Sequence, residues 1–217
     1  MAEKNVMIEP KQFESLITNS YELLKQQHII QRIWKHDHTV WKPESTEITN
    51  RLGWLHSPEF MRNAIGEITS FAQQVVSEGF THALLLGMGG SSLAPEVFRG
   101  IFGVKSGFLD LAVLDSTTPG AVLAAARMFA PEKTLFIAST KSGSTIETLS
   151  FLKYFYNATL KIVGNGTVGK HFIAITDPGS GLEALAKELN FRKIFLNDPE
   201  MEAGFQRYRI SDWCLLG

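Results

Sequence analysis

The sequence predicts an α/β fold in which helices cover both faces of a five-stranded parallel sheet, with further helices before the sheet. Five short apolar runs are typical of strands buried on both faces. These runs are His82–Leu86, Phe108–Leu114, Thr134–Ala138, Phe172–Ile175 and Lys193–Leu196. Helical patterns alternate with them, near 92–103, 119–129, 145–158 and 181–189. Such alternation is characteristic of parallel strands joined by crossover helices.

The segment before the first strand is predicted to be helical. Residues 10–34 place apolar side chains at helical spacing, and residues 58–79 form a second helical pattern. Pro43 and Gly53 interrupt the pattern between them, which indicates a connection with a short helix. The expected division is an N-terminal helical segment, a sheet domain and a C-terminal tail, at residues 1–57, 58–199 and 200–217.

Three of the predicted helices carry capping signals at their starts. Thr118-Pro119 fits an N-cap followed by proline at the first helical position. Ser144 with Glu147, and Ser180 with Glu183, fit the capping box. These helices therefore begin directly after strands, at the edge where open α/β sheets bind ligands.

Composition excludes several classes of partner. The chain has 217 residues, with 21 Lys+Arg against 22 Asp+Glu and a formal net charge of -1, so we expect neither nucleic-acid nor membrane-surface binding. Cys214 is the single cysteine, and the N-terminal residues lack the apolar core of a signal peptide. We therefore expect a reducing, cytoplasmic compartment.

The loop Gly87-Met-Gly-Gly-Ser-Ser92 follows the first predicted strand. Glycines let backbone N–H groups approach a ligand closely, and the next helix directs unpaired N–H groups and its positive dipole end at an anion. The alternative is a tight strand–helix turn made of small residues. Three glycines with two serines exceed what such a turn needs.

The loop after the third predicted strand is rich in donors. Thr140, Ser142, Ser144 and Thr145 supply hydroxyls, and Lys141 supplies a positive charge. A phosphate is bound by this combination of groups. The alternative is helix capping alone, which accounts for Ser144 but leaves the other donors unexplained.

The two loops follow the first and third strands, which are neighbours in the flavodoxin-like order 2-1-3-4-5. In that order both loops face one crevice, and the expected ligand is a small phosphorylated molecule. A dinucleotide is the rival ligand, because Gly87-x-Gly89-x-x-Ser92 resembles the fingerprint but lacks its third glycine. His36-x-His38 has no further ligand at suitable spacing, so we expect no metal and no cofactor.

Several segments together resemble the glucose-6-phosphate isomerase family. They are "LLLGMGGSSLAPEVF", "STKSGSTIETLSFLKYF", "AITDPGSGLEALA" and "FLNDP", and the resemblance runs from about residue 28 to about residue 199. The segments "IWKHDHTVWKP" and "NRLGWL" are most similar to the isomerase part of bacterial enzymes fused to transaldolase. The resemblance implies an SIS (sugar isomerase) domain and an aldose–ketose isomerase of glycolysis and gluconeogenesis.

The resemblance also implies a phosphate site. Its residues in this chain are Gly90, Ser91, Thr140, Lys141, Ser142 and Thr145. The family's catalytic Glu, ring-opening His and second-domain Lys are expected beyond Gly217, so no catalytic residue is assigned here. A non-catalytic sugar-phosphate sensor is therefore the alternative function.

The tail departs from the family pattern. The family has a Gly-Gly-Arg segment after "NDP", whereas this chain has Arg207 without the paired glycine. We expect a truncated or altered C-terminus, with apolar surface near Trp213 left for a partner. That partner is expected to be a second copy of the chain or a second SIS domain.

Overall fold

A computed structural model describes residues 13–49 and 52–197 of the chain. The chain divides into two compact units between Leu52 and Gly53, and each is described by itself. The predicted tail at residues 200–217, with Arg207, lies outside the described residues.

The N-terminal unit contains two short helices where the sequence predicted one helical stretch. Helix α1 spans Glu14–Gln26 and α2 spans Ile29–Trp34. They are separated at His28, whose left-handed backbone (φ +53°) turns the chain away from the helical path of α1. Every residue of α1 is exposed in this structure.

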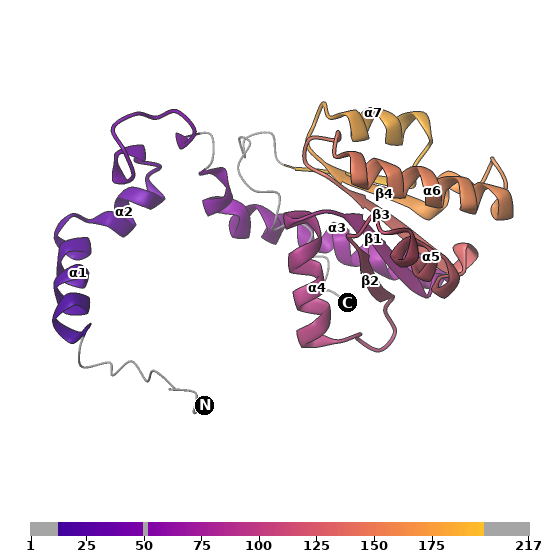
Figure 1. The fold of residues 1–217 in the computed structure, drawn as a ribbon, viewed down its shortest axis with the longest axis horizontal. Helices are drawn as coiled ribbons and strands as arrows, with labels where there is room; N and C mark the ends of the chain where they lie inside the picture. The colour runs from indigo at the N-terminus through magenta and orange to yellow at the C-terminus, as the bar shows by residue number, and fades with distance from the viewer. Residues whose placement is uncertain (1–12, 50–51, 198–217) are drawn as a thin grey trace, which may run out of the picture. The chain divides into compact units, whose positions relative to one another are not determined.

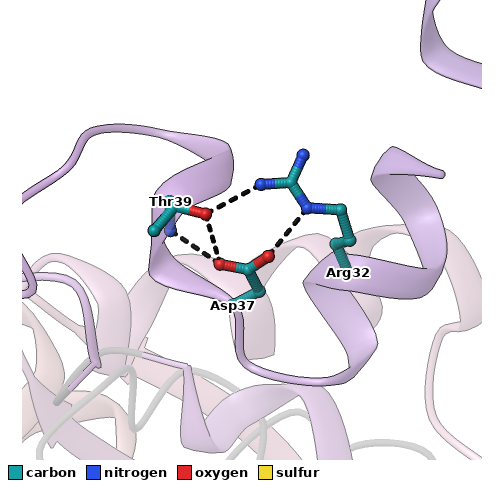
Figure 2. A network of polar contacts seen from close by, with 3 residues as sticks. All are labelled: Arg32, Asp37 and Thr39. Atoms are coloured by element: carbon teal, nitrogen blue, oxygen red, sulfur yellow. Dashed lines mark hydrogen bonds and ion pairs between the residues drawn. The ribbon is translucent and has the colours of Figure 1, made fainter. Parts of the chain in front are cut away.

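A polar network closes the turn between α2 and the short 3₁₀ helix η2 (His38–Val40) (Figure 2). The Asp37 carboxylate accepts hydrogen bonds from the backbone N–H and hydroxyl of Thr39, and from Arg32 Nε at 2.7 Å. The Thr39 hydroxyl and Arg32 hold the pKa of Asp37 at about 2. The carboxylate thereby acts as the N-cap of η2 and fixes its start.

The second unit is an all-parallel sheet of order β2-β1-β3-β4-β5 (Figure 1). This confirms the predicted fold class and the flavodoxin-like order. The strands are β1 (His82–Gly87), β2 (Asp110–Leu114), β3 (Thr134–Ser139), β4 (Phe172–Thr176) and β5 (Lys193–Leu196). The α-helices are α3 (Ser57–Ser77), α4 (Gly90–Phe102), α5 (Pro119–Met128), α6 (Ile146–Val163) and α7 (Gly181–Glu188). The 3₁₀ helices are η4 (Gly53–His56), η5 (Pro131–Lys133) and η6 (Val168–His171).

Two hydrophobic cores lie on the two faces of the sheet, because side chains alternate along each strand. On β3, Phe136 and Ala138 belong to the core under α5, α6 and α7, whereas Leu135 and Ile137 belong to the core under α3. Burial of one Leu or Phe side chain contributes roughly 1.5–3 kcal/mol. The continuous apolar runs in the sequence therefore correspond to strands buried on both faces, as predicted.

Helix α4 lies on the same face as α3. It connects β1 to β2 and contacts both strands, whereas α5, α6 and α7 connect strands that progress in the opposite direction across the sheet. Parallel crossovers are right-handed, so the reversal of direction places α4 on the face opposite to α5. The point of reversal lies between β1 and β3, which are direct neighbours.

Candidate functional site

The first donor loop connects β1 to α4. Because α4 begins at Gly90, the predicted site residues Gly90 and Ser91 are its first two residues. Gly89 has φ +53°, a conformation that favours glycine, and its carbonyl accepts hydrogen bonds from the Ser92 hydroxyl and from two backbone N–H groups. Within the described residues the Gly90 N–H has no acceptor, so it is available at the positive end of the helix.

The first turn of α4 lies over the ends of β1 and β3. A side-chain carbon on Gly87 would lie 3.2 Å from Ser91 Cβ and 3.4 Å from the Ser139 carbonyl oxygen. Gly87 and Ser139 are register partners in β1 and β3. The absence of a side chain at Gly87 therefore lets Ser91 approach the end of β3.

The second donor loop, Thr140 to Thr145, connects β3 to α6. Thr140 is buried, and its hydroxyl lies 2.8 Å from the Thr145 hydroxyl, so the two ends of the loop are joined. The Ser142 and Ser144 hydroxyls, also 2.8 Å apart, form a hydrogen bond at the exposed tip, and Lys141 is half-buried. Lys141 is the one charged residue in residues 87–92 and 140–145.

The predicted capping box at Ser144 and Glu147 is wrong. Helix α6 begins at Ile146 with Thr145 at the N-cap, one residue later than the capping box requires. Ser144 instead donates its backbone N–H to the Ser142 hydroxyl. The hydroxyls of this loop thus bond one another rather than the helix, which removes capping as their explanation.

The second loop is held from β4 and α7, at positions distant in sequence. The buried Thr176 hydroxyl lies 2.7 Å from the Thr140 carbonyl oxygen and 2.7 Å from the Ser180 hydroxyl. The backbone N–H of Asp177 donates to the Lys141 carbonyl. Thr176 was not among the predicted site residues. The sequence feature that could have indicated it is its hydroxyl, which directly follows the apolar run Phe172–Ile175.

Helix α7 begins after the predicted N-cap, and the Ser180 half of the capping box is confirmed, whereas Glu183 bonds the residue before the N-cap. Ser180 is the N-cap, and its hydroxyl accepts a hydrogen bond from the Glu183 N–H. Glu183 accepts from the Gly179 N–H and pairs with Lys187 at 2.6 Å. The hydrogen bond from Lys187, and then the one from Gly179, lower the pKa of Glu183.

Gly143 packs directly against the start of α7. Its φ is +69°, and a side-chain carbon there would lie 2.4 Å from the Leu182 backbone N and 2.8 Å from that of Gly181. Backbone atoms cannot move aside as a flexible side chain can. Glycine is therefore required both by the conformation and by the space.

The structure brings the predicted site residues to the ends of two adjacent strands. Gly90 and Ser91 follow β1, and Thr140, Lys141, Ser142 and Thr145 follow β3. Backbone N–H groups, hydroxyls and one ammonium at a single sheet edge are suited to an anion such as a phosphate. In the described parts of the chain, no three or more His, Cys, Asp or Glu residues are grouped to hold a metal. No helix among the same residues is long and apolar enough to cross a membrane.

Comparison with known proteins agrees with this geometry. The family model described as phosphoglucose isomerase matches residues 50–188. A glucose-6-phosphate isomerase of Carboxydothermus hydrogenoformans is 35% identical over 164 residues, which cover 71% of this chain and 35% of that enzyme. The chain thus spans about a third of the length of the curated relatives that it matches.

Two solved structures share the fold. The crystal structure of a hypothetical protein from Thermus thermophilus matches with a TM-score of 0.73 and 25% identity, covering 95% of this chain and 46% of that one. A glucose-6-phosphate isomerase from Chlamydia trachomatis matches with a TM-score of 0.55 and 21% identity, covering 79% of this chain and 30% of that one.

Proposed function

Since the chain belongs to the phosphoglucose isomerase family, we propose that it supplies the sugar-phosphate-binding domain of a glucose-6-phosphate isomerase. The enzyme interconverts glucose 6-phosphate and fructose 6-phosphate. The observation that carries the proposal is the adjacency of the two donor loops, which leave neighbouring strands at register partners Gly87 and Ser139.

In this proposal the phosphate lies between the two loops. The Gly90 N–H and the Ser91 hydroxyl bind it from the first turn of α4, where the helix dipole favours negative charge. The hydroxyls of Ser142 and Thr145 bind it from the other side. Lys141 neutralises part of the phosphate charge, while Thr140 holds Thr145 in place.

The second loop supports the proposal because it is positioned before any ligand arrives. Thr176, Ser180 and Gly143 fix its backbone through contacts with β4 and α7. A loop that is already ordered loses less conformational entropy on binding.

The domain that we propose for sugar-phosphate binding comprises residues 58–199, which include both donor loops.

Binding the phosphate orients one end of the substrate, and isomerisation also needs a base that moves a proton between adjacent carbons. The family resemblance assigns that base, the ring-opening His and a Lys to positions outside these 217 residues. We therefore expect the 217-residue chain to bind fructose 6-phosphate and to convert it far more slowly than a full-length isomerase does. The partner proposed to complete the site is a second SIS domain or a second copy of the chain, in the cytoplasm.

The test is titration calorimetry of the chain with fructose 6-phosphate. The double variant Ser142→Ala, Thr145→Ala should bind at least about tenfold more weakly, because each lost hydrogen bond to a charged group contributes roughly 1.5–3 kcal/mol. The matched control is Ser77→Ala, Thr81→Ala. It removes the same two types of hydroxyl near the amino-terminal end of β1, at the other end of the strands from the donor loops. Its affinity should equal that of the unaltered chain.

Equal affinity in the site variant and the unaltered chain would overturn the proposed phosphate site. A parallel titration with NADH tests the dinucleotide alternative, and heat from NADH that NADP abolishes would favour that alternative. A coupled assay of glucose 6-phosphate formation, with a full-length isomerase as reference, separates an enzyme domain from a sensor. Activity that appears only when the remaining part of a family enzyme is added would support the proposal that this chain is a domain of an enzyme.

A further inference from the structure

Ser139, the last residue of β3, carries a buried hydroxyl without a hydrogen-bond partner among the described residues. Its exposed fraction is 1%. A buried hydroxyl that lacks a partner destabilises the folded state, and alanine at this position would avoid that loss. A role in binding a ligand would account for a hydroxyl at this position.

The surroundings of Ser139 point to the first loop as the source of that partner. Its side chain lies on the same face as Leu135 and Ile137, which is the face that α3 and α4 cover. The neighbour of Ser139 in β1 is Gly87, which has no side chain. A side-chain carbon on Gly87 would meet both Ser91 Cβ, at 3.2 Å, and the Ser139 carbonyl oxygen, at 3.4 Å, so Ser91 and Ser139 lie around the same point.

We propose that Ser139 is a positioning residue of the sugar-phosphate site and acts through Ser91. In the bound state the Ser139 O–H donates to Ser91 Oγ, and the Ser91 O–H donates to a phosphate oxygen. A hydroxyl can donate one hydrogen bond and accept two, so Ser91 serves both roles at once. Successive hydrogen bonds in a buried site also strengthen one another. This inference rests on the proposed function.

A second buried hydroxyl provides a matched control. Thr159 Oγ1 is also without a partner in the described residues, and the residue is fully buried. It lies in the second half of α6, on the stripe that also buries Phe151 and Phe155 in the other core. Thr159→Val therefore removes an unpartnered buried hydroxyl that lies away from both donor loops.

The experiment compares fructose 6-phosphate affinity, by titration calorimetry, with the thermal unfolding midpoint of the ligand-free chain. For Ser139→Ala we expect roughly tenfold weaker binding, together with an unfolding midpoint that is unchanged or higher. For Thr159→Val we expect unchanged affinity. A purely structural role for Ser139 would lower the midpoint and leave the affinity unchanged.

A double-mutant cycle tests the route through Ser91. The variant Ser91→Ala, Ser139→Ala should bind within about twofold of Ser91→Ala alone, because the two hydroxyls act in one chain of hydrogen bonds. Unchanged affinity in Ser139→Ala, or additive losses in the double variant, would overturn the inference while Ser91→Ala still reports on the proposed function. Absence of fructose 6-phosphate binding by the unaltered chain would overturn both.

Discussion

The two donor loops leave adjacent strands, yet they are held in different ways. The first loop is fixed locally, because the hydrogen bonds of Ser92 and of the Ser91 N–H end on Gly89 and Met88 in the same loop. The second loop is fixed by partners more than 30 residues away in sequence, through Thr176 and the start of α7.

This difference assigns distinct tasks to the loops. The second loop is bound to β4 and α7, so its donors are arranged before the ligand arrives. The loop residues between β1 and α4 make no such long-range hydrogen bond within the described residues. The position of the Gly90 N–H is set by the start of α4. We therefore expect mutations of the second loop and of its supports to lower stability more than matched mutations of the first loop do.

The largest effect is expected from glycine substitution in the two loops. Gly143→Ala should lower the free energy of unfolding by about 3 kcal/mol or more, since it combines an unfavourable φ with a clash against the backbone of α7. Gly89→Ala should cost about 1–3 kcal/mol, because its backbone (φ +53°, ψ −117°) also favours glycine but open space surrounds it. Urea unfolding followed by circular dichroism measures both.

Equal losses in the two glycine variants would mean that the contact between Gly143 and α7 adjusts without cost, so that the positive φ alone sets the loss of stability. The unfolding slope should stay the same in both variants, since neither change alters the surface exposed on unfolding.

An intermediate effect on stability is expected when the one side-chain hydroxyl that supports each loop is removed, Thr176 for the second loop and Ser92 for the first. Thr176→Val keeps the shape of a fully buried side chain but leaves the Thr140 carbonyl and the Ser180 hydroxyl without this partner, at a cost of about 2 kcal/mol. Ser92→Ala should cost about 1 kcal/mol or less, because the Gly89 carbonyl keeps two backbone donors.

The same urea experiment measures this pair. Fructose 6-phosphate affinity should also fall in Thr176→Val, because the second loop loses its attachment to β4. A Thr176→Val chain as stable as the unaltered one would show that the second loop does not depend on β4.

The smallest effect is expected from Glu183, which supports the start of α7. Its folded-state pKa is lowered, so its stabilising contribution is fully present above the usual glutamate pKa and is lost as the pH falls through the lowered value. In Glu183→Gln this part of the acid dependence should disappear. Unfolding midpoints recorded between about pH 2 and pH 7 provide the measurement. An unchanged acid profile in Glu183→Gln would exclude a role of this carboxylate in holding α7.

Local patterns predicted most of the sheet. The strand Lys193–Leu196 has the bounds expected from its apolar run, and the other strands differ by one or two residues at one end. Apolar runs are reliable because burial on both faces leaves little freedom in residue type. The break at His28 was missed, since the helical spacing of apolar residues continues through it and only the backbone conformation changes.

The two capping-box patterns show where sequence reasoning fails in the site. Ser180 caps α7 as predicted, whereas Ser144 bonds Ser142 and Thr145 occupies the N-cap position of α6. Both patterns have the same spacing, so the outcome depends on the neighbouring loop residues and on the contact of Gly143 with α7. The sequence did not reveal the role of Thr176, because the carbonyl groups to which it donates lie 35 and 36 residues earlier in the chain.

Binding of a sugar phosphate between the two donor loops can be followed residue by residue through amide chemical shifts. Fructose 6-phosphate is titrated into the ¹⁵N-labelled chain, with fructose as the control that lacks the phosphate. We expect saturable shifts centred on the amides of Gly90, Ser91 and Thr140 to Thr145, and much weaker shifts with fructose. Shifts centred elsewhere, or equal shifts with both sugars, would exclude a phosphate site between the two loops.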